Sequence, residues 1–137
     1  MTRYVLDACA LIALLREEKG ADIVSSIFNA AAKKTALITI HTINLFEVYY
    51  DVCRTSSEER AERILAELKK RPIEIISEIN EELFKEAGRF KLKYKMSLAD
   101  AFALAQASIL NAELLTSDHH EFDAVEKSEP IRFLWIR

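Results

Sequence analysis

Four acidic residues stand in apolar segments, where charged side chains are uncommon. They are Asp7, Glu47, Asp100 and Asp118. Asp7 is the only charged residue in the stretch 4–15, and Asp100 lies in the segment 98–110, which would be apolar on nearly every face of a helix. A carboxylate in such surroundings is costly unless it is paired, protonated or bound to a cation. The four acids are therefore candidate catalytic or metal-binding residues.

Each acid taken alone also has a structural explanation. Asp7 has the position of a helix N-cap, and Ser97 with Asp100 has the spacing of a capping box. Glu47 fits a first-turn acid that the helix dipole favours, and Asp118 fits a turn residue bonded to its own backbone. The stronger evidence is the placement of all four acids together.

Short β-branched segments alternate with longer helical patterns along the chain. The predicted strands are Arg3–Leu6, Leu37–Ile40, Ile73–Ile76, Glu113–Leu115 and Ile131–Trp135. The predicted helices are Ala10–Glu17, Ala21–Ala32, Ile43–Cys53, Ser57–Arg71, Glu81–Tyr94 and Ser97–Leu110. This alternation is typical of a parallel sheet with helices on both faces.

All four acids fall where a predicted strand ends or where the following helix begins. The carboxyl ends of parallel strands meet at one edge of a sheet, and ligands bind there. Like charges gather at such an edge only with a compensating cation, and all-oxygen ligation suits Mg²⁺ or Mn²⁺. Such an ion activates water and neutralises charge on a phosphate. The pattern therefore indicates metal-assisted hydrolysis of a phosphodiester.

The composition limits the class of protein. With 137 residues, 50% hydrophobic and 30% charged, the chain is expected to form one globular domain over residues 1–137. The net charge of −3 disfavours a generally basic nucleic-acid-binding protein. No apolar run is long enough to span a membrane. Cys9 and Cys53 fit neither a disulfide framework nor a zinc site, so we expect buried free thiols and a cytoplasmic location.

A local basic stretch is the candidate phosphate-binding surface. Lys85, Arg89 and Lys93 form one stripe on the predicted helix 81–94, which leads directly toward Asp100. The alternative is an ordinary solvated helix face. We expect the histidines in polar loops and not as metal ligands: His41, His119 and His120.

The same segments resemble the motifs of a known family. They are Val5–Leu15 with Asp7, Leu45–Val48 with Glu47, Ser97–Ala101 with Asp100, and Leu114–Asp118 with Phe122. In this order they resemble the PIN-domain ribonucleases over the whole chain, and in particular the single-domain VapC-like toxins of toxin–antitoxin pairs. The resemblance implies a three-layer α/β/α sandwich with a mainly parallel sheet. It also implies endoribonuclease activity that depends on Mg²⁺ or Mn²⁺.

The resemblance assigns roles to individual residues. Asp7 and Asp100 match the principal metal ligands, and Asp118 is a further candidate ligand. Glu47 and Asp118 match acids that complete the site or position water, and Thr116 matches a hydroxyl that contacts the substrate. The implied partners are an RNA substrate, a second copy of the chain in a homodimer, and a VapB-like antitoxin that masks the cleft.

Two departures from the family pattern stand near the acids. Cys9 occupies a position where the family often has Ser or Thr, so a hydroxyl contact is missing. After Asp118 the family often has a second Asp, and here Glu121 or Asp123 is the candidate for that further ligand.

Other functions are compatible with the same fold. An aspartyl-phosphate phosphatase or receiver domain needs a further acid beside the first one, and Ala8 and Cys9 follow Asp7 instead. A non-catalytic PIN-like module that binds RNA or protein would show loss of acids, and all four are present. An RNA-processing nuclease of this fold usually carries appended domains, for which a chain of 137 residues leaves no room.

Overall fold

The centre of the molecule is a five-stranded sheet in a computed structural model that describes all residues, 1–137. The strands are β1 (Thr2–Leu6), β2 (Ala36–His41), β3 (Glu74–Ile76), β4 (Glu113–Thr116) and β5 (Phe133–Trp135). They lie in the order β3-β2-β1-β4-β5, and every neighbouring pair is parallel. The strand order reverses between β1 and β4, so the crevice at which this type of sheet binds ligands lies at their carboxyl ends.

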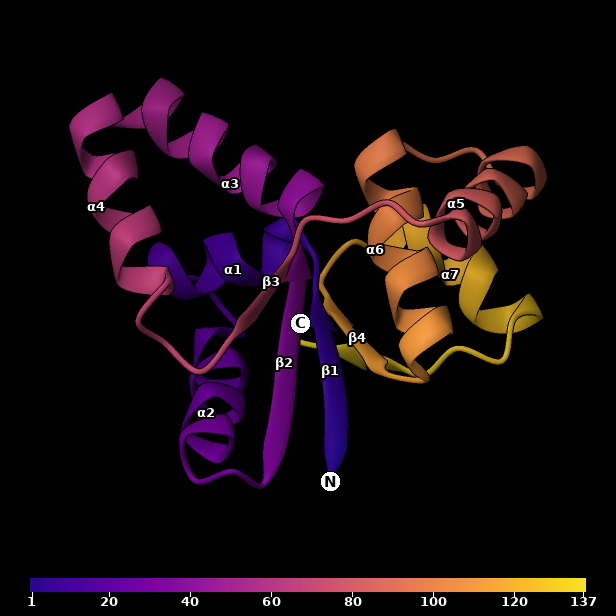
Figure 1. Cartoon of the computed structure of the whole chain (residues 1–137), viewed down its shortest axis with the longest axis horizontal. Helices are drawn as coiled ribbons and strands as arrows, with labels where there is room; N and C mark the ends of the chain where they lie inside the picture. Colours follow the sequence, from indigo (N-terminus) through magenta and orange to yellow (C-terminus); the bar gives the residue numbers. More distant parts are fainter.

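Seven helices surround the sheet. They are α1 (Ala8–Leu15), α2 (Ala21–Ala32), α3 (Thr42–Thr55), α4 (Glu58–Leu68), α5 (Glu81–Lys93), α6 (Leu98–Leu110) and α7 (His119–Ser128). Figure 1 shows α1, α2 and α4 on one side of the sheet and α5, α6 and α7 on the other. Helix α3 starts at the carboxyl end of β2 and contacts α1, α4 and α6. The fold is therefore a three-layer α/β/α sandwich, as the sequence predicts.

The central strands are buried on both faces. Val5 and Leu114 pack into a core with α5, α6 and α7, whereas their neighbours Leu6 and Leu115 pack into a second core with α1 and α2. All four side chains are fully buried. This explains the continuous apolar runs of β1 and β4, since a parallel strand covered on both sides needs no polar alternation. None of the helices is both long enough and apolar enough to cross a bilayer.

The structure adds one helix to those that the sequence predicts. Residues His119–Ser128 form α7, although the sequence places His119 and His120 in a polar loop. The helix is short and buries only Phe122 and Val125, so its hydrophobic pattern is weak. Its N-cap, Asp118, is the signal that marks its start. The other predicted elements are present, with ends displaced by up to a few residues.

His41 is not a loop residue. It ends β2, its side chain is almost fully buried, and its Nδ1 accepts a hydrogen bond from the Ile43 amide at 3.1 Å. Its Nε2 lies 3.0 Å from the carbonyl oxygen of Glu78. The imidazole thus caps α3 and fixes the chain that follows β3, which are structural roles.

Candidate active site

Asp7 follows β1 and caps α1 at the middle of the sheet edge. Its carboxylate accepts hydrogen bonds from the Ala10 amide at 2.9 Å, from the Cys9 thiol at 3.1 Å and from the Thr116 hydroxyl. The side chain is only 2% exposed. Burial raises the pKa of Asp7 to about 6, although the three hydrogen bonds oppose this rise. Asp7 therefore is an N-cap and also contributes a carboxylate to a shared pocket.

Asp100 lies in the first turn of α6, next to the acids that follow β1 and β4. Ser97 is the N-cap, and its hydroxyl accepts a hydrogen bond from the Asp100 amide at 3.1 Å. Burial raises the pKa of Asp100 to about 7, and the charges of Asp7, Asp118 and Glu121 add to this effect. The Asp100 carboxyl is thus part of a group of mutually repelling acids, which a helix cap alone does not explain.

Asp118 and Glu121 enter the same cluster from the start of α7. The Asp118 carboxylate accepts a hydrogen bond from the Glu121 amide at 3.2 Å, and this caps the helix. Oxygens of Asp100, Asp118 and Glu121 all lie within 4.8 Å of one another. Oxygen ligands on opposite sides of one Mg²⁺ lie about 4 Å apart, so the cluster has nearly the size that one ion requires.

Glu121 is the site residue that the sequence leaves undecided. Its Oε2 atom is buried and has no hydrogen-bond partner, which is unusual for a carboxylate oxygen. The alternative, Asp123, lies two residues after Glu121, on nearly the opposite face of α7, and pairs instead with His119 at 2.8 Å. Asp118 is the N-cap of α7, and Glu121 follows it by three residues in the first turn of that helix. A prediction that starts a helix at Asp118 therefore also places Glu121 beside the cluster.

Glu47 reaches the pocket from α3. The helix is capped by His41, so Glu47 lies in its second turn, and the interpretation as a first-turn acid is wrong. Burial raises the pKa of Glu47, and the charges of Asp7 and Asp118 raise it further. This electrostatic coupling places Glu47 in the same acidic environment as the other three predicted acids.

One pocket brings all four predicted acids together. It is lined by Asp7, Ala8, Cys9, Ile12, Phe46, Glu47, Tyr50, Asp51, Asp100 and Asp118. Five of these residues are carboxylates, and no lysine or arginine is among them. The N-termini of α1, α6 and α7 carry partial positive charge next to Asp7, Asp100 and Asp118. This charge offsets part of the repulsion between the three acids. The pocket therefore has the donor set of a site for a hard divalent cation.

Two polar side chains beside Asp7 are already engaged within the site. Thr116 is fully buried, and besides donating to Asp7 its hydroxyl accepts a hydrogen bond from the Asp118 amide at 3.0 Å. Cys9 and Cys53 are free, and both are only partly buried, in contrast to the core thiols that we expected. Burial and then the charge of Asp7 raise the pKa of the Cys9 thiol to about 11.

The three predicted phosphate-binding residues do not line this pocket. Lys85 pairs with Glu81 at 2.8 Å, whereas Arg89 and Lys93 both pair with Glu129, at 3.1 and 3.0 Å. Their charges are thus largely balanced within the protein. A role of this stripe in RNA binding stays a prediction.

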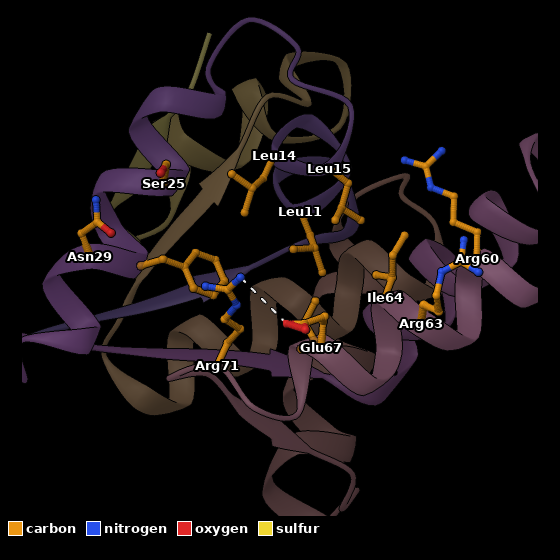
Figure 2. Close-up of a pocket in the computed structure, with 12 residues that line it drawn as sticks. Leu11, Leu14, Leu15, Ser25, Asn29, Arg60, Arg63, Ile64, Glu67 and Arg71 are labelled. Atoms are coloured by element: carbon orange, nitrogen blue, oxygen red, sulfur yellow. Dashed lines mark ion pairs between the residues drawn. The ribbon is translucent and has the colours of Figure 1, made fainter.

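A second concavity lies between α1, α2 and α4, away from the carboxylates (Figure 2). Its apolar residues are Leu11, Leu14, Leu15, Phe28, Ile64 and Leu68. Arg60, Arg63 and Arg71 border it. Arg71 pairs with Glu67 at 3.9 Å (Figure 2) and Arg63 pairs with Glu59 at 3.4 Å, whereas Arg60 has no ion-pair partner. The groove thus combines an apolar floor with a cationic edge.

The chain belongs to the PIN domain family, whose sequence model matches residues 4–128. Comparison with curated proteins by sequence gives no significant match. Solved structures with the same fold include VapBC2 from Rickettsia felis bound to a promoter DNA fragment, with a TM-score of 0.76 at 20% identity and 98% of each chain covered. DNA-bound VapBC from Salmonella typhimurium has a TM-score of 0.76 at 15% identity, with 100% of each chain covered.

A third similar solved structure is named as a toxin only. Mycobacterium tuberculosis VapC20, described as a sarcin-ricin loop cleaving toxin, has a TM-score of 0.63 at 13% identity. It covers 81% of this chain, and this chain covers 86% of it. At these identities the three structures establish a VapC-like PIN fold.

Proposed function

We propose that the protein is a metal-dependent endoribonuclease and the toxin of a toxin–antitoxin pair. The observation that carries the proposal is the cluster of Asp100, Asp118 and Glu121, whose carboxylate oxygens lie within 4.8 Å of one another. One Glu121 oxygen is also buried without a hydrogen-bond partner. Membership of the PIN family and the likeness to VapC20 support cleavage of RNA.

The residues fit a hard cation such as Mg²⁺ or Mn²⁺. Asp100, Asp118 and Glu121 would hold it, with Asp7, which lines the same pocket as Asp100 and Asp118, as a further ligand. When bound, the ion supplies Lewis acidity, which lowers the pKa of water and neutralises charge on the phosphate. Hydrogen bonds from Ala10 and Thr116 hold the Asp7 carboxylate in one orientation toward this group.

Glu47 and Asp118 are proposed to orient the attacking water. Burial raises the pKa of Glu47, and the charges of Asp7 and Asp118 raise it further, so this carboxylate takes up a proton at higher pH than an isolated glutamate. Attack of water on phosphorus breaks one phosphodiester P–O bond and leaves a phosphate monoester and a free hydroxyl group.

Incubation of purified protein with RNA tests the activity. Cleavage is expected with Mg²⁺ or Mn²⁺ and is expected to be lost with EDTA or in the Asp7→Asn variant. RNA that is bound but stays intact with either metal would instead support a non-catalytic PIN-like module.

The proposed antitoxin would mask the acidic pocket, and we propose that it also binds the groove between α1, α2 and α4 (Figure 2). The apolar floor and arginine edge complement an amphipathic segment that carries acidic residues. The VapBC complexes among the similar structures support a partner of this class. A neighbouring small reading frame that encodes a DNA-binding protein is expected. Its product should bind the parent protein, and should bind an Arg60→Glu/Arg63→Glu variant much more weakly.

A homodimer acting in the cytoplasm completes the proposal. Large apolar side chains are exposed on α5 and at the start of α6: Phe84, Leu92 and Leu98. Exposed apolar side chains of this size are candidates for a contact surface, and we propose that a second copy covers them. Light scattering at tens of micromolar protein is expected to give the mass of a dimer, and a strictly monomeric mass would contradict it.

A further inference from the structure

Two aromatic residues of α3 stand at the mouth of the acidic pocket. Phe46 and Tyr50 both line the pocket together with Glu47 and Asp100. They are 62% and 57% exposed, which is high for aromatic side chains. Because they are four residues apart, they lie on the same face of the helix.

The two rings are stacked on each other and contact no other ring. Their centroids lie 6.3 Å apart, and their planes differ by 21°. The neighbouring Tyr49 is different, because its hydroxyl donates a hydrogen bond to Glu62 at 2.7 Å and so ties α3 to α4. Phe46 and Tyr50 therefore form an open aromatic surface continuous with the carboxylates, whereas Tyr49 has a structural partner.

The charge around the pocket makes this surface significant. The nearby arginines, Arg16 and Arg54, both pair with Asp51. No lysine or arginine lines the pocket itself, and its carboxylates repel phosphate groups. Apart from a phosphate that a bound cation would neutralise, affinity for a nucleic acid at this point therefore depends on contacts other than pairing with basic side chains. Stacking of bases on aromatic rings is such a contact, since it needs no positive charge on the protein.

We propose that Phe46 and Tyr50 form a stacking platform for unpaired bases next to the phosphodiester that is cleaved. The proposal rests on the proposed ribonuclease function and adds to it two residues that hold bases beside the bond that is cleaved. Base faces in a duplex are covered by neighbouring bases, whereas those of single strands and loops are free to stack on a protein ring. The platform thus selects unpaired RNA at the site of chemistry.

Binding of a fluorescently labelled single-stranded RNA tests the platform. The measurement uses Ca²⁺, with the integrity of the RNA checked on a gel, and compares the parent with a Phe46→Leu/Tyr50→Leu variant. We expect the dissociation constant to rise about tenfold or more, the range for loss of one or two stacked bases. A Phe46→Tyr/Tyr50→Phe variant keeps both rings and should bind within about twofold of the parent. A Leu37→Ala variant removes exposed apolar surface elsewhere and should bind equally.

A spectroscopic signal separates stacking from a general loss of structure. An RNA that contains 2-aminopurine is expected to lose fluorescence on binding the parent and the ring-swap variant, but much less on binding the leucine variant. Duplex RNA of the same sequence should bind the parent more weakly and be insensitive to the leucine changes.

Equal affinity of the leucine variant for single-stranded RNA would overturn the platform and leave the ribonuclease proposal standing. A second result would also overturn the platform. In that result the leucine variant is monomeric, the parent is dimeric, and the two bind RNA with equal affinity when both are monomers. In that case the rings cover a second copy. A parent protein that neither binds nor cleaves RNA would overturn the proposed function and the platform together.

Discussion

The hydroxyl of Thr116 donates a hydrogen bond to the carboxylate of Asp7 across 109 positions of sequence. The same hydroxyl accepts a hydrogen bond from the Asp118 amide at 3.0 Å. Thr116 therefore links the acid that follows β1 to the acid that follows β4, at the point where the strand order reverses. Its hydroxyl also lies 3.5 Å from the Cys9 thiol. These contacts within the protein give Thr116 a positioning role, and the contact with substrate stays a prediction.

A Thr116→Val variant tests this link. The change keeps the shape of the side chain but leaves the buried Asp7 carboxylate without one of its donors, which should lower the free energy of unfolding by about 1–3 kcal/mol. Because that hydrogen bond lowers the pKa of Asp7, its loss should raise the pKa further above about 6. The acid limb of the cleavage-rate profile should therefore move to higher pH. A Thr116→Ser variant keeps the hydroxyl and should resemble the parent in both measurements.

Much of the site can be predicted from the sequence, because the ends of strands and the starts of helices are clearly marked in it. Asp7 and Asp100 stand out because their segments are otherwise apolar. The parallel fold places Asp7 at the edge where β1 ends, whereas Asp100 reaches this edge because α6, which follows another helix, packs against β1 and β4. Their structural and functional explanations proved compatible, since Asp7 caps α1 and also lines the pocket.

What the sequence does not reveal depends on side-chain contacts between distant elements. Arg89 and Lys93 read as a free basic stripe, but Glu129 folds back from the end of α7 and pairs with both. The exposure of Phe46 and Tyr50 at the mouth of the pocket likewise depends on the position of α3 relative to the acids, which the sequence does not show. Such pairings depend on tertiary placement, which local propensity does not encode.

The two glycines of the chain should respond in opposite ways to substitution by alanine. Gly88 lies within α5 and an added Cβ would meet nothing within 4 Å, so Gly88→Ala should raise the free energy of unfolding by about 0.5–1 kcal/mol. Gly20 has φ +100°, and an added Cβ would lie 2.5 Å from the Ile136 carbonyl oxygen. Gly20→Ala should therefore lower stability by more than about 1 kcal/mol. Urea unfolding measures both, and a loss of stability in Gly88→Ala would contradict an open surface there.

The basic stripe can be tested by its effect on the salt dependence of RNA binding. Changing Lys85, Arg89 and Lys93 together to Ala should weaken binding and flatten the log–log salt slope by up to about one unit for each lost phosphate contact. Equal slopes for variant and parent would remove the three residues from the binding surface.

The same triple change is also expected to lower the free energy of unfolding, so the RNA-binding experiment needs a control for stability. Although burial alone would raise the pKa of Glu129, hydrogen bonds from Arg89, Tyr94 and Lys93 lower it to about 2. Removing both cations leaves this carboxylate, whose side chain is 4% exposed, without charged partners. Adding Glu129→Gln to the triple variant should restore part of the lost stability, and RNA binding is best compared in that background.

Asp100→Asn should make the metal-free protein more stable. The change removes one charge from a cluster of repelling carboxylates at nearly constant shape. We expect a melting temperature in EDTA that is higher by a few degrees, corresponding to about 1 kcal/mol in a domain of this size. A purely structural role of Asp100 in the capping of α6 predicts the opposite, a loss of about 1 kcal/mol.

The gain in stability from Asp100→Asn should increase as the pH rises. The pKa of Asp100 rises from 3.8 to about 7 on folding, so the folded state binds this proton more tightly than the unfolded state. The parent is therefore penalised progressively as the pH rises from about 4 to about 7, and the penalty is constant above that range. The difference in stability between variant and parent should be small at pH 4, grow through this window and then level off. Melting curves in EDTA across the window measure it.

Added Mg²⁺ should reverse the order of the two proteins. A ligand that binds only the folded state stabilises it by mass action, so Mg²⁺ should raise the melting temperature of the parent but not that of Asp100→Asn. The variant should also fail to cleave RNA, because it lacks one of the clustered oxygens that would hold the ion. A variant that is less stable than the parent in EDTA and still cleaves RNA with Mg²⁺ would make Asp100 a helix-capping residue only. That result would refute the metal site at the start of α6.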